Sequence, residues 1–159
     1  MLFNKDKTSL IQYPIGNSRA DYTVPDGVVT IGDISFAYSQ NLVSVTISDG
    51  VTKIGDGAFN GYVFTDIATH LTSITIPNSV EYIGDGAFCD CDGLTSIAIP
   101  NSVTTIGPDA FSWCDNLTTV NIGEKVSSIG DKAFFRCVNL TTIYCEATTP
   151  PTLVSDVFA

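Results

Sequence analysis

LTSITIPNSVEYIGDGAFCDCDG, residues 71–93, is the stretch that decides the fold, because the chain repeats it. The same pattern returns 23 residues later as LTSIAIPNSVTTIGPDAFSWCDN (94–116) and again as LTTVNIGEKVSSIGDKAFFRCVN (117–139), and a further copy opens at Leu140. A fixed period with apolar residues at constant offsets is typical of a solenoid, in which each turn buries its apolar face only by stacking on its neighbours.

Each repeat carries its own secondary-structure signals. In residues 71–76, isoleucines alternate with serine and threonine, which is the period-2 pattern of a strand with one buried face. Pro77 ends this strand, because proline cannot donate to a β-ladder. Val80 and Ile83 then point inward from a second short extended stretch. The repeat therefore predicts two short strands per turn.

The second half of each repeat predicts a corner and a compact turn. Gly84 permits a sharp bend, and Asp85 stands where an N-cap residue would accept amide hydrogens. We therefore expect one helical or 3₁₀ turn that carries Ala87 and Phe88 into the core. Equivalent aspartates stand at Asp33, Asp56 and Asp131, whereas Pro108 interrupts the row.

The repeats divide the chain into a lead-in and an array. Residues 1–19 precede the first repeat and are expected to cap its open end, because solenoid ends need a cover. Residues 20–159 form about six turns. The rhythm breaks at an insertion, residues 60–70, and at an irregular end, residues 147–159, which contains a proline pair. Loops on a rigid scaffold are frequent recognition sites.

Charge and composition exclude several classes of function. The 159 residues include 17 acidic and only seven basic side chains, for a formal net charge of -10. Such a surface repels phosphate backbones and anionic lipids, so we expect no nucleic-acid binding and no electrostatic membrane docking. No apolar run approaches the ~18 to 20 residues of a membrane span. We expect no membrane insertion and a soluble chain, whose abrupt ends are typical of a piece of a longer protein.

Three of the five cysteines form a column along the solenoid, because Cys91, Cys114 and Cys137 are one period apart. Stacked turns lie roughly 4.8 Å apart, so a disulfide between neighbours is geometrically conceivable. Burial as reduced, small apolar residues is the favoured interpretation, because column positions are core positions. Cys145 falls at an inward strand position, and Cys89, outside the column, is expected to be an exposed thiol.

The repeat L-x-x-I-x-I-P-x-x-V-x-x-I-G-x-x-A-F-x-x-C-x-x resembles the BspA-like class of leucine-rich repeats, over residues 20–159. The resemblance implies a leucine-rich-repeat solenoid with a short parallel sheet on one face and short extended and 3₁₀ or helical turns on the other. Proteins of this class are usually exported or displayed on bacterial surfaces and act in adhesion. The class has no catalytic motif, so the resemblance implies no active-site residues and no cofactor.

Residues that could support chemistry have simpler explanations. His70 has no identifiable serine or cysteine partner, which disfavours a hydrolase triad. Cys89 and Cys91 lack the second pair of ligands that a zinc site requires. The aspartate row falls short of the six to eight oxygens that calcium prefers. The sequence therefore predicts a protein without catalytic, cofactor or metal sites.

The candidate partner-binding side chains lie outside the sheet face, with one exception. The outward strand positions are small and uncharged except for one tyrosine, and hot spots are usually Trp, Tyr or Arg. The candidate residues are Tyr62, Val63, Phe64, His70, Trp113, Phe135, Arg136 and Tyr144. Contact with a partner and simple covering of the solenoid edge are equally compatible with this pattern.

The sequence favours a non-catalytic, extracellular or cell-surface module that binds a protein ligand, such as a host matrix or cell-surface protein. A structural spacer that presents other domains of a longer surface protein is the alternative, because the strand face is uniformly Ser/Thr-rich. An enzyme is the third hypothesis, and only His70 and the loose thiols favour it. The extracellular location is an implication of the resemblance.

Overall fold

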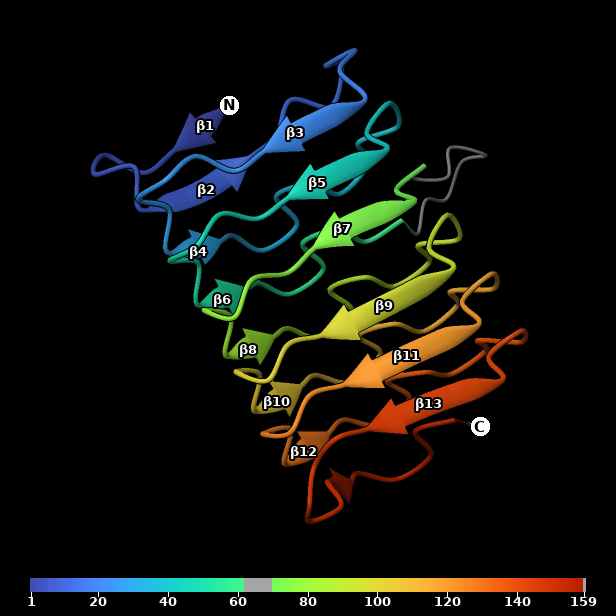
Figure 1. Ribbon diagram of the computed structural model, residues 1–159. Helices are drawn as coiled ribbons and strands as arrows, with labels where there is room; N and C mark the ends of the chain where they lie inside the picture. Colours follow the sequence, from blue (N-terminus) through green and yellow to red (C-terminus); the bar gives the residue numbers. More distant parts are fainter. Residues whose placement is uncertain (62–69, 159) are drawn as a thin grey trace.

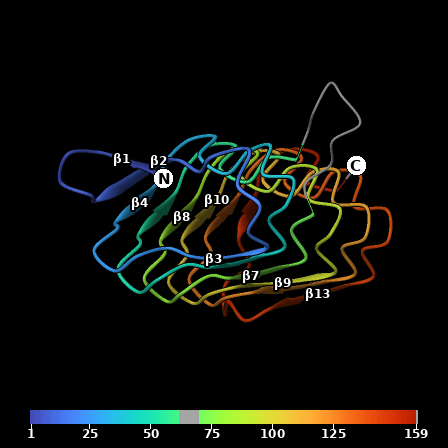
Figure 2. The same ribbon diagram turned by 90° about the horizontal axis from the view of Figure 1, so that it is seen from above.

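The computed structural model describes residues 1–61 and 70–158. It shows a stack of similar chain turns (Figure 1). Seen along the stack, each turn has three sides (Figure 2). Two sides are short parallel strands and the third is a run of hydrogen-bonded turns. Tyr62, Val63 and Phe64 lie outside the described residues.

The first side is an eight-stranded sheet made of the Val-x-x-Ile-Gly segments (Figure 1). Its strands, in spatial order, are β1 (Leu2–Phe3), β2 (Ser9–Gln12), β4 (Thr30–Ile31), β6 (Lys53–Ile54), β8 (Tyr82–Ile83), β10 (Thr105–Ile106), β12 (Ser128–Ile129) and β14 (Thr152–Leu153). All neighbours pair in parallel except β1 and β2, which are antiparallel. Ile83 pairs with Ile106 and Ile106 with Ile129, so the register places one isoleucine per turn in the core.

The second side consists of two three-stranded sheets. One contains β3 (Asp21–Thr23), β5 (Ser44–Thr46) and β7 (Ser73–Thr75), and the other contains β9 (Ser96–Ile99), β11 (Thr119–Ile122) and β13 (Thr142–Cys145). Burial alternates along β9 and β11 as the sequence predicts, whereas β13 at the end of the stack is mostly exposed. Ile97 and Ile99 are buried, whereas Ser96 and Ala98 are exposed.

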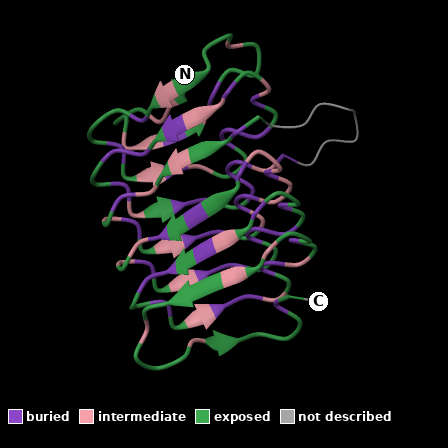
Figure 3. Cartoon of the chain, turned by 45° about the vertical axis from the view of Figure 1, so that its right-hand side comes forward, coloured by how far each residue is buried: buried purple, intermediate pink, exposed green. Residues whose placement is uncertain are grey.

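A ladder of phenylalanines forms the centre of the core. Phe36, Phe59, Phe88, Phe111 and Phe134 stack face to face, with ring centroids 4.8 to 5.4 Å apart and planes within 8° of parallel. All five are buried, and Figure 3 shows the inward-facing stretches of each turn as buried. Each ring covers its neighbour, so the ladder locks the turns in register. In the N-terminal lead-in, Tyr13 extends the ladder with its ring 5.2 Å from Phe36.

The third side differs in one respect from the expectation. The described residues contain no helix or 3₁₀ segment, and the predicted helical turn is replaced by consecutive hydrogen-bonded turns. The physical reason is backbone conformation. Two residues before each ladder phenylalanine, the backbone is left-handed, with φ between 52° and 58°, as at Gly86, Asp109 and Lys132. A left-handed residue ends a right-handed helix.

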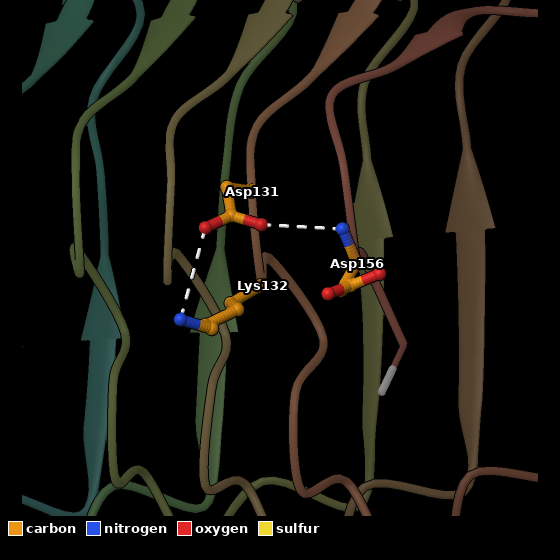
Figure 4. A network of polar contacts seen from close by, with 3 residues as sticks. All are labelled: Asp131, Lys132 and Asp156. Atoms are coloured by element: carbon orange, nitrogen blue, oxygen red, sulfur yellow. Dashed lines mark hydrogen bonds and ion pairs between the residues drawn. The ribbon is translucent and has the colours of Figure 1, made fainter.

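The aspartates also act differently from the expected N-caps. The carboxylate of Asp33 accepts the backbone N–H of Asp56 in the next turn, at 2.9 Å, and Asp56 does the same for Asp85, at 3.1 Å. Near the C-terminus, Asp131 accepts the N–H of Asp156 at 3.2 Å and lies 3.8 Å from Nζ of Lys132 (Figure 4). The row therefore joins successive turns to each other.

All five cysteines are reduced, and the column cysteines are buried as predicted. The Cys114 thiol donates to the Phe88 carbonyl at 3.1 Å, and Cys137 donates to Phe111 in the same way. Two expectations were wrong. Cys89 is partly buried and accepts a hydrogen bond from the Ser112 hydroxyl at 3.2 Å, whereas Cys145 is exposed because no described strand covers β13 on that side.

Candidate functional site

The side of the solenoid made of hydrogen-bonded turns is here named the turn face. It carries large exposed side chains, Trp113 among them. It comprises residues 32–41, 55–61, 84–93, 107–116 and 130–139, which follow the strands of the eight-stranded sheet. The buried phenylalanine of each turn fixes the backbone on either side of it. The residues directly after each phenylalanine therefore take equivalent positions in successive turns.

In four of the five ladder turns, the residue two places after the phenylalanine has an unusual backbone. Tyr38, Asp90, Trp113 and Arg136 all have φ between 59° and 63°. This left-handed region is unfavourable for residues with a Cβ, and costs of the order of 1–3 kcal/mol each are typical for such strained positions. Glycine would be the unstrained choice. The chain nevertheless places large aromatic and cationic side chains at this strained position.

Trp113, Phe135 and Arg136, here named the Trp113 cluster, contact one another across two turns. The Arg136 guanidinium carbon lies 4.9 Å from the centroid of the Trp113 ring, which is cation–π geometry. The Phe135 ring meets the Trp113 ring edge to face, with centroids 5.8 Å apart. The Trp113 backbone N–H also donates to the Phe135 carbonyl at 2.8 Å. Trp113 remains 43% exposed, so part of its side chain is open to a partner.

Acidic groups surround the turn next to this cluster. Burial raises the pKa of Asp90, the residue one period before Trp113, and the nearby charges of Asp92 and Asp115 raise it further. The Trp113 cluster thus places two aromatic rings and one cation beside a group of carboxylates. This combination is suited to bind a partner protein whose surface has both apolar and charged groups.

The other predicted residues lie apart from this cluster. Tyr144 is on the outward face of β13 and is 61% exposed. His70 occupies a repeat position that carries asparagine in three other turns. The asparagine side chains of Asn116 and Asn139 donate to backbone carbonyls in the preceding turn, both at 2.8 Å. His70 makes the corresponding contact, from Nδ1 to the Gln40 carbonyl at 2.8 Å, so its ring has a place in the same inter-turn ladder.

Sequence reasoning missed two features of this surface. Val138 is 64% exposed, two residues after Arg136, at a repeat position where other turns carry Asp92 and Asp115. Its apolar character at an acidic column position was the available signal. The left-handed conformation of Trp113 and Arg136 had no such signal, because neither residue is a glycine.

Metal and membrane chemistry have no support in the described part of the chain. Within residues 1–61 and 70–158, no group of three or more histidine, cysteine or acidic residues is placed to hold a metal ion. The same residues include no helix long and apolar enough to cross a membrane.

Solved structures of bacterial repeat proteins are similar to this chain. A leucine-rich cell surface protein from Faecalibacterium prausnitzii superposes with a TM-score of 0.81 at 31% identity, and a leucine-rich repeat protein from Eubacterium ventriosum with a TM-score of 0.80 at 33% identity. The alignments cover 88% and 89% of this chain, but only 35% and 37% of those proteins. The pneumococcal vaccine antigen PcpA has a TM-score of 0.77 at 26% identity, over 99% of this chain and 36% of that one. The chain therefore spans about a third of these proteins.

No match was found among curated proteins. The repeat family described as the BspA type leucine rich repeat region matches residues 16–70 and 60–158, with six copies. This match covers nearly the whole array, and its copy number agrees with the six turns that the sequence predicts. The chain belongs to the BspA-type leucine-rich repeat family.

Proposed function

We propose that this chain is a non-catalytic, adhesion-type binding module of a bacterial cell-surface or secreted protein, and that it binds a protein ligand through the Trp113 cluster. Leucine-rich repeats generally serve protein–protein interaction and are typically non-catalytic. The similar proteins described as a cell surface protein and a vaccine antigen support an extracellular location. The ligand that we propose is a host matrix or cell-surface protein.

The observation that carries this proposal is the exposed Trp113 plane held by Arg136 and Phe135 on a left-handed backbone. Tryptophan and arginine are the most frequent binding hot spots, and a rigid aromatic loses little conformational entropy on binding. Strained backbone conformations persist where the surrounding structure imposes them, and they concentrate at functional sites. By contrast, the outward positions of the described strands on the second side offer only Tyr144 as a large side chain.

The proposal is tested by solid-phase binding of the purified chain to immobilised laminin, fibronectin and collagen. The Trp113→Ala and Arg136→Ala variants should each weaken binding by about tenfold or more, the usual effect of removing a hot spot. Tyr144→Ala is the matched control, because it removes an exposed aromatic from the outward face of β13, apart from the Trp113 cluster. Loss of binding in Tyr144→Ala with normal binding in Trp113→Ala would move the site to the sheet.

The insertion at residues 60–70 needs its own test, because Tyr62, Val63 and Phe64 remain candidate partner residues. Leu42 and Leu71 are 29 residues apart, so deleting six residues, 63–68, restores the 23-residue spacing of the other turns. If the insertion takes part in recognition, this variant should fold and lose affinity. If it folds and binds as the parent chain does, the site is confined to the Trp113 cluster.

A further inference from the structure

The sheet on the second side of the solenoid is interrupted between β7 and β9. In the described residues, no backbone hydrogen bond connects residues 71–77 with residues 94–100, although these segments are consecutive turns of the same length. Elsewhere the equivalent bond is present: the Thr72 N–H donates to Val43 and the Thr118 N–H to Thr95, both at 2.9 Å. The Thr95 N–H has no such bond to Thr72.

The first side of the solenoid remains continuous at the same height. Tyr82 pairs with Thr105 and Ile83 with Ile106, so β8 and β10 hold the two turns together. The two turns also lie close together at one corner, where an added Cβ on Gly93 would collide with the Leu71 carbonyl. The interruption is therefore confined to the facing edges of β7 and β9 (Figure 1).

The core is less well covered on the β7 side of this interruption. Ile74 and Ile76 are only partly buried, whereas the equivalent Ile97 and Ile99 in the next turn are each 3% exposed. The β7 edge thus combines unpaired backbone groups with partly accessible apolar side chains, whereas the inward isoleucines of β9 stay buried. Water satisfies the backbone groups but leaves the isoleucine surface uncovered, so an occupant that satisfies both would be favoured.

The facing strands also lack the protection that free edges usually have. Natural proteins place charged residues or prolines on exposed edge strands to prevent pairing with other chains. The outward residues here are Ser73 and Thr75 on β7, and Ser96 and Ala98 on β9. These side chains are small and uncharged, and they would not obstruct an approaching strand.

We propose that the β7–β9 interruption accepts an extended strand from a partner protein. Only a polypeptide in the β conformation presents N–H and C=O groups at the spacing of both edges. Its inward side chains should be β-branched and apolar, to pack on Ile74 and Ile76, and its outward ones small and uncharged. Binding requires β7 and β9 to stand about two strand spacings apart, ~9.6 Å. The β8–β10 pairing and the turn-face hydrogen bonds, such as the Phe88 N–H to the Ala110 carbonyl at 2.7 Å, hold the two turns together on the other sides.

The site is independent of the Trp113 cluster, and a matched pair of peptides tests it. The probe is a fluorescein-labelled peptide that copies residues 94–99, Leu-Thr-Ser-Ile-Ala-Ile, which has the required pattern. Its control is the same peptide with alternate amides N-methylated, which removes the donors to one neighbouring strand. Fluorescence polarisation should show saturable binding of the first peptide and at least about tenfold weaker binding of the second.

Location is read by hydrogen exchange and by a reversible cross-link. Bound peptide should slow amide exchange in residues 72–76 and 95–99. The double variant Thr75→Cys with Ala98→Cys, in a Cys145→Ser background, should lose binding when oxidised and regain it with a reductant. The matched control, Ala98→Cys with Asn121→Cys, links β9 to its paired neighbour β11 and should bind in both states.

Three results would overturn this proposal. The first is no binding of the unmodified peptide up to about 1 mM, a limit that corresponds to only ~4 kcal/mol. The second is equal affinity of the N-methylated peptide. The third is protection at β13, whose outer edge is also unpaired among the described strands, with none at β7 or β9.

Discussion

At the scale of single residues, the left-handed positions define what is special about this repeat array. In the turns of Phe36, Phe88, Phe111 and Phe134, two positions, one on either side of the phenylalanine, have a conformation that glycine adopts most easily. The sequence places tryptophan and arginine at the second position in consecutive turns. Because Trp113 and Arg136 are one period apart, stacking of the turns brings them together. Two residues that are 23 positions apart in the sequence thus contact each other, with the Arg136 guanidinium carbon 4.9 Å from the centroid of the Trp113 ring.

We expect Trp113→Gly to change stability little and binding strongly. Glycine relieves the left-handed strain, which offsets the lost contacts with Arg136 and Phe135, so the free energy of unfolding should change by less than ~1 kcal/mol. Urea unfolding measures this change, and the matrix-binding assay should show at least a tenfold loss. Tyr38→Gly, at the same left-handed repeat position but three turns from the cluster, is the control and should bind normally. A large stability loss in Trp113→Gly would show that the tryptophan is a structural residue.

The buried thiols give the fold a predicted pH dependence. Burial raises the pKa of Cys137 from its ordinary value near 9 to about 11, and raises that of Cys114 well above 9. Between pH 9 and 11 these thiols ionise in the unfolded chain but stay neutral in the fold. Stability should therefore be complete below pH 9 and fall as the pH rises, by up to ~1.4 kcal/mol per pH unit for each thiol.

Denaturant unfolding at pH 8, 9, 10 and 11 measures this loss. The double variant Cys114→Ala with Cys137→Ala is less stable at pH 8 but should lose less stability on going to pH 11. An identical slope in the parent and the double variant would contradict the prediction.

At the scale of elements, each turn is joined to the next by polar ladders as well as by strands. Aspartate carboxylates accept backbone N–H groups of the following turn, and asparagine amides donate to carbonyls of the preceding one. His70 has the asparagine position in its turn. The sequence predicted the strands correctly, because alternation and proline signals are local. It assigned the aspartates to helix caps, because both roles use the same residue type before the same turn.

The asparagine ladder predicts a specific stability difference. Asn116→Ala removes the bond to the Asp92 carbonyl and should lower the free energy of unfolding by about 0.5–1.5 kcal/mol. Asn121→Ala, on the outward face of β11, removes an exposed amide side chain from the strand face and should change stability by less than ~0.5 kcal/mol. Thermal unfolding of both variants measures the difference. Equal melting temperatures would contradict a role for the ladder.

At the scale of the whole molecule, the solenoid is one continuous stack on its first side and two blocks on its second. The period predicted the overall architecture, the phenylalanine core and the reduced cysteine column, because each depends only on what repeats. The Trp113 cluster was partly foreseeable, since its residues are one period apart. The β7–β9 interruption was not, because residues 71–93 and 94–116 match the repeat equally well and pairing depends on backbone position.

The interruption predicts a local difference in hydrogen exchange. Thr95 and Thr118 both follow leucine at the same repeat position, but only the Thr118 N–H donates to the preceding turn. The Thr95 amide should therefore exchange at least about tenfold faster than the Thr118 amide, because it lacks the protecting bond. NMR-detected exchange resolves the two amides. Equal protection would show that β7 and β9 pair in solution.

The most direct test of the account uses the single tryptophan of the chain, Trp113. Its fluorescence reports the proposed binding surface without any label. Iodide quenching is measured for the free chain and for the chain saturated with a matrix fragment, or a peptide from one, that lacks tryptophan and binds in the solid-phase assay. We expect binding to lower the quenching constant several-fold and to shift the emission to shorter wavelength, because the partner covers the indole ring. Unchanged quenching at saturation would contradict the claim that this family member binds its partner through the Trp113 cluster.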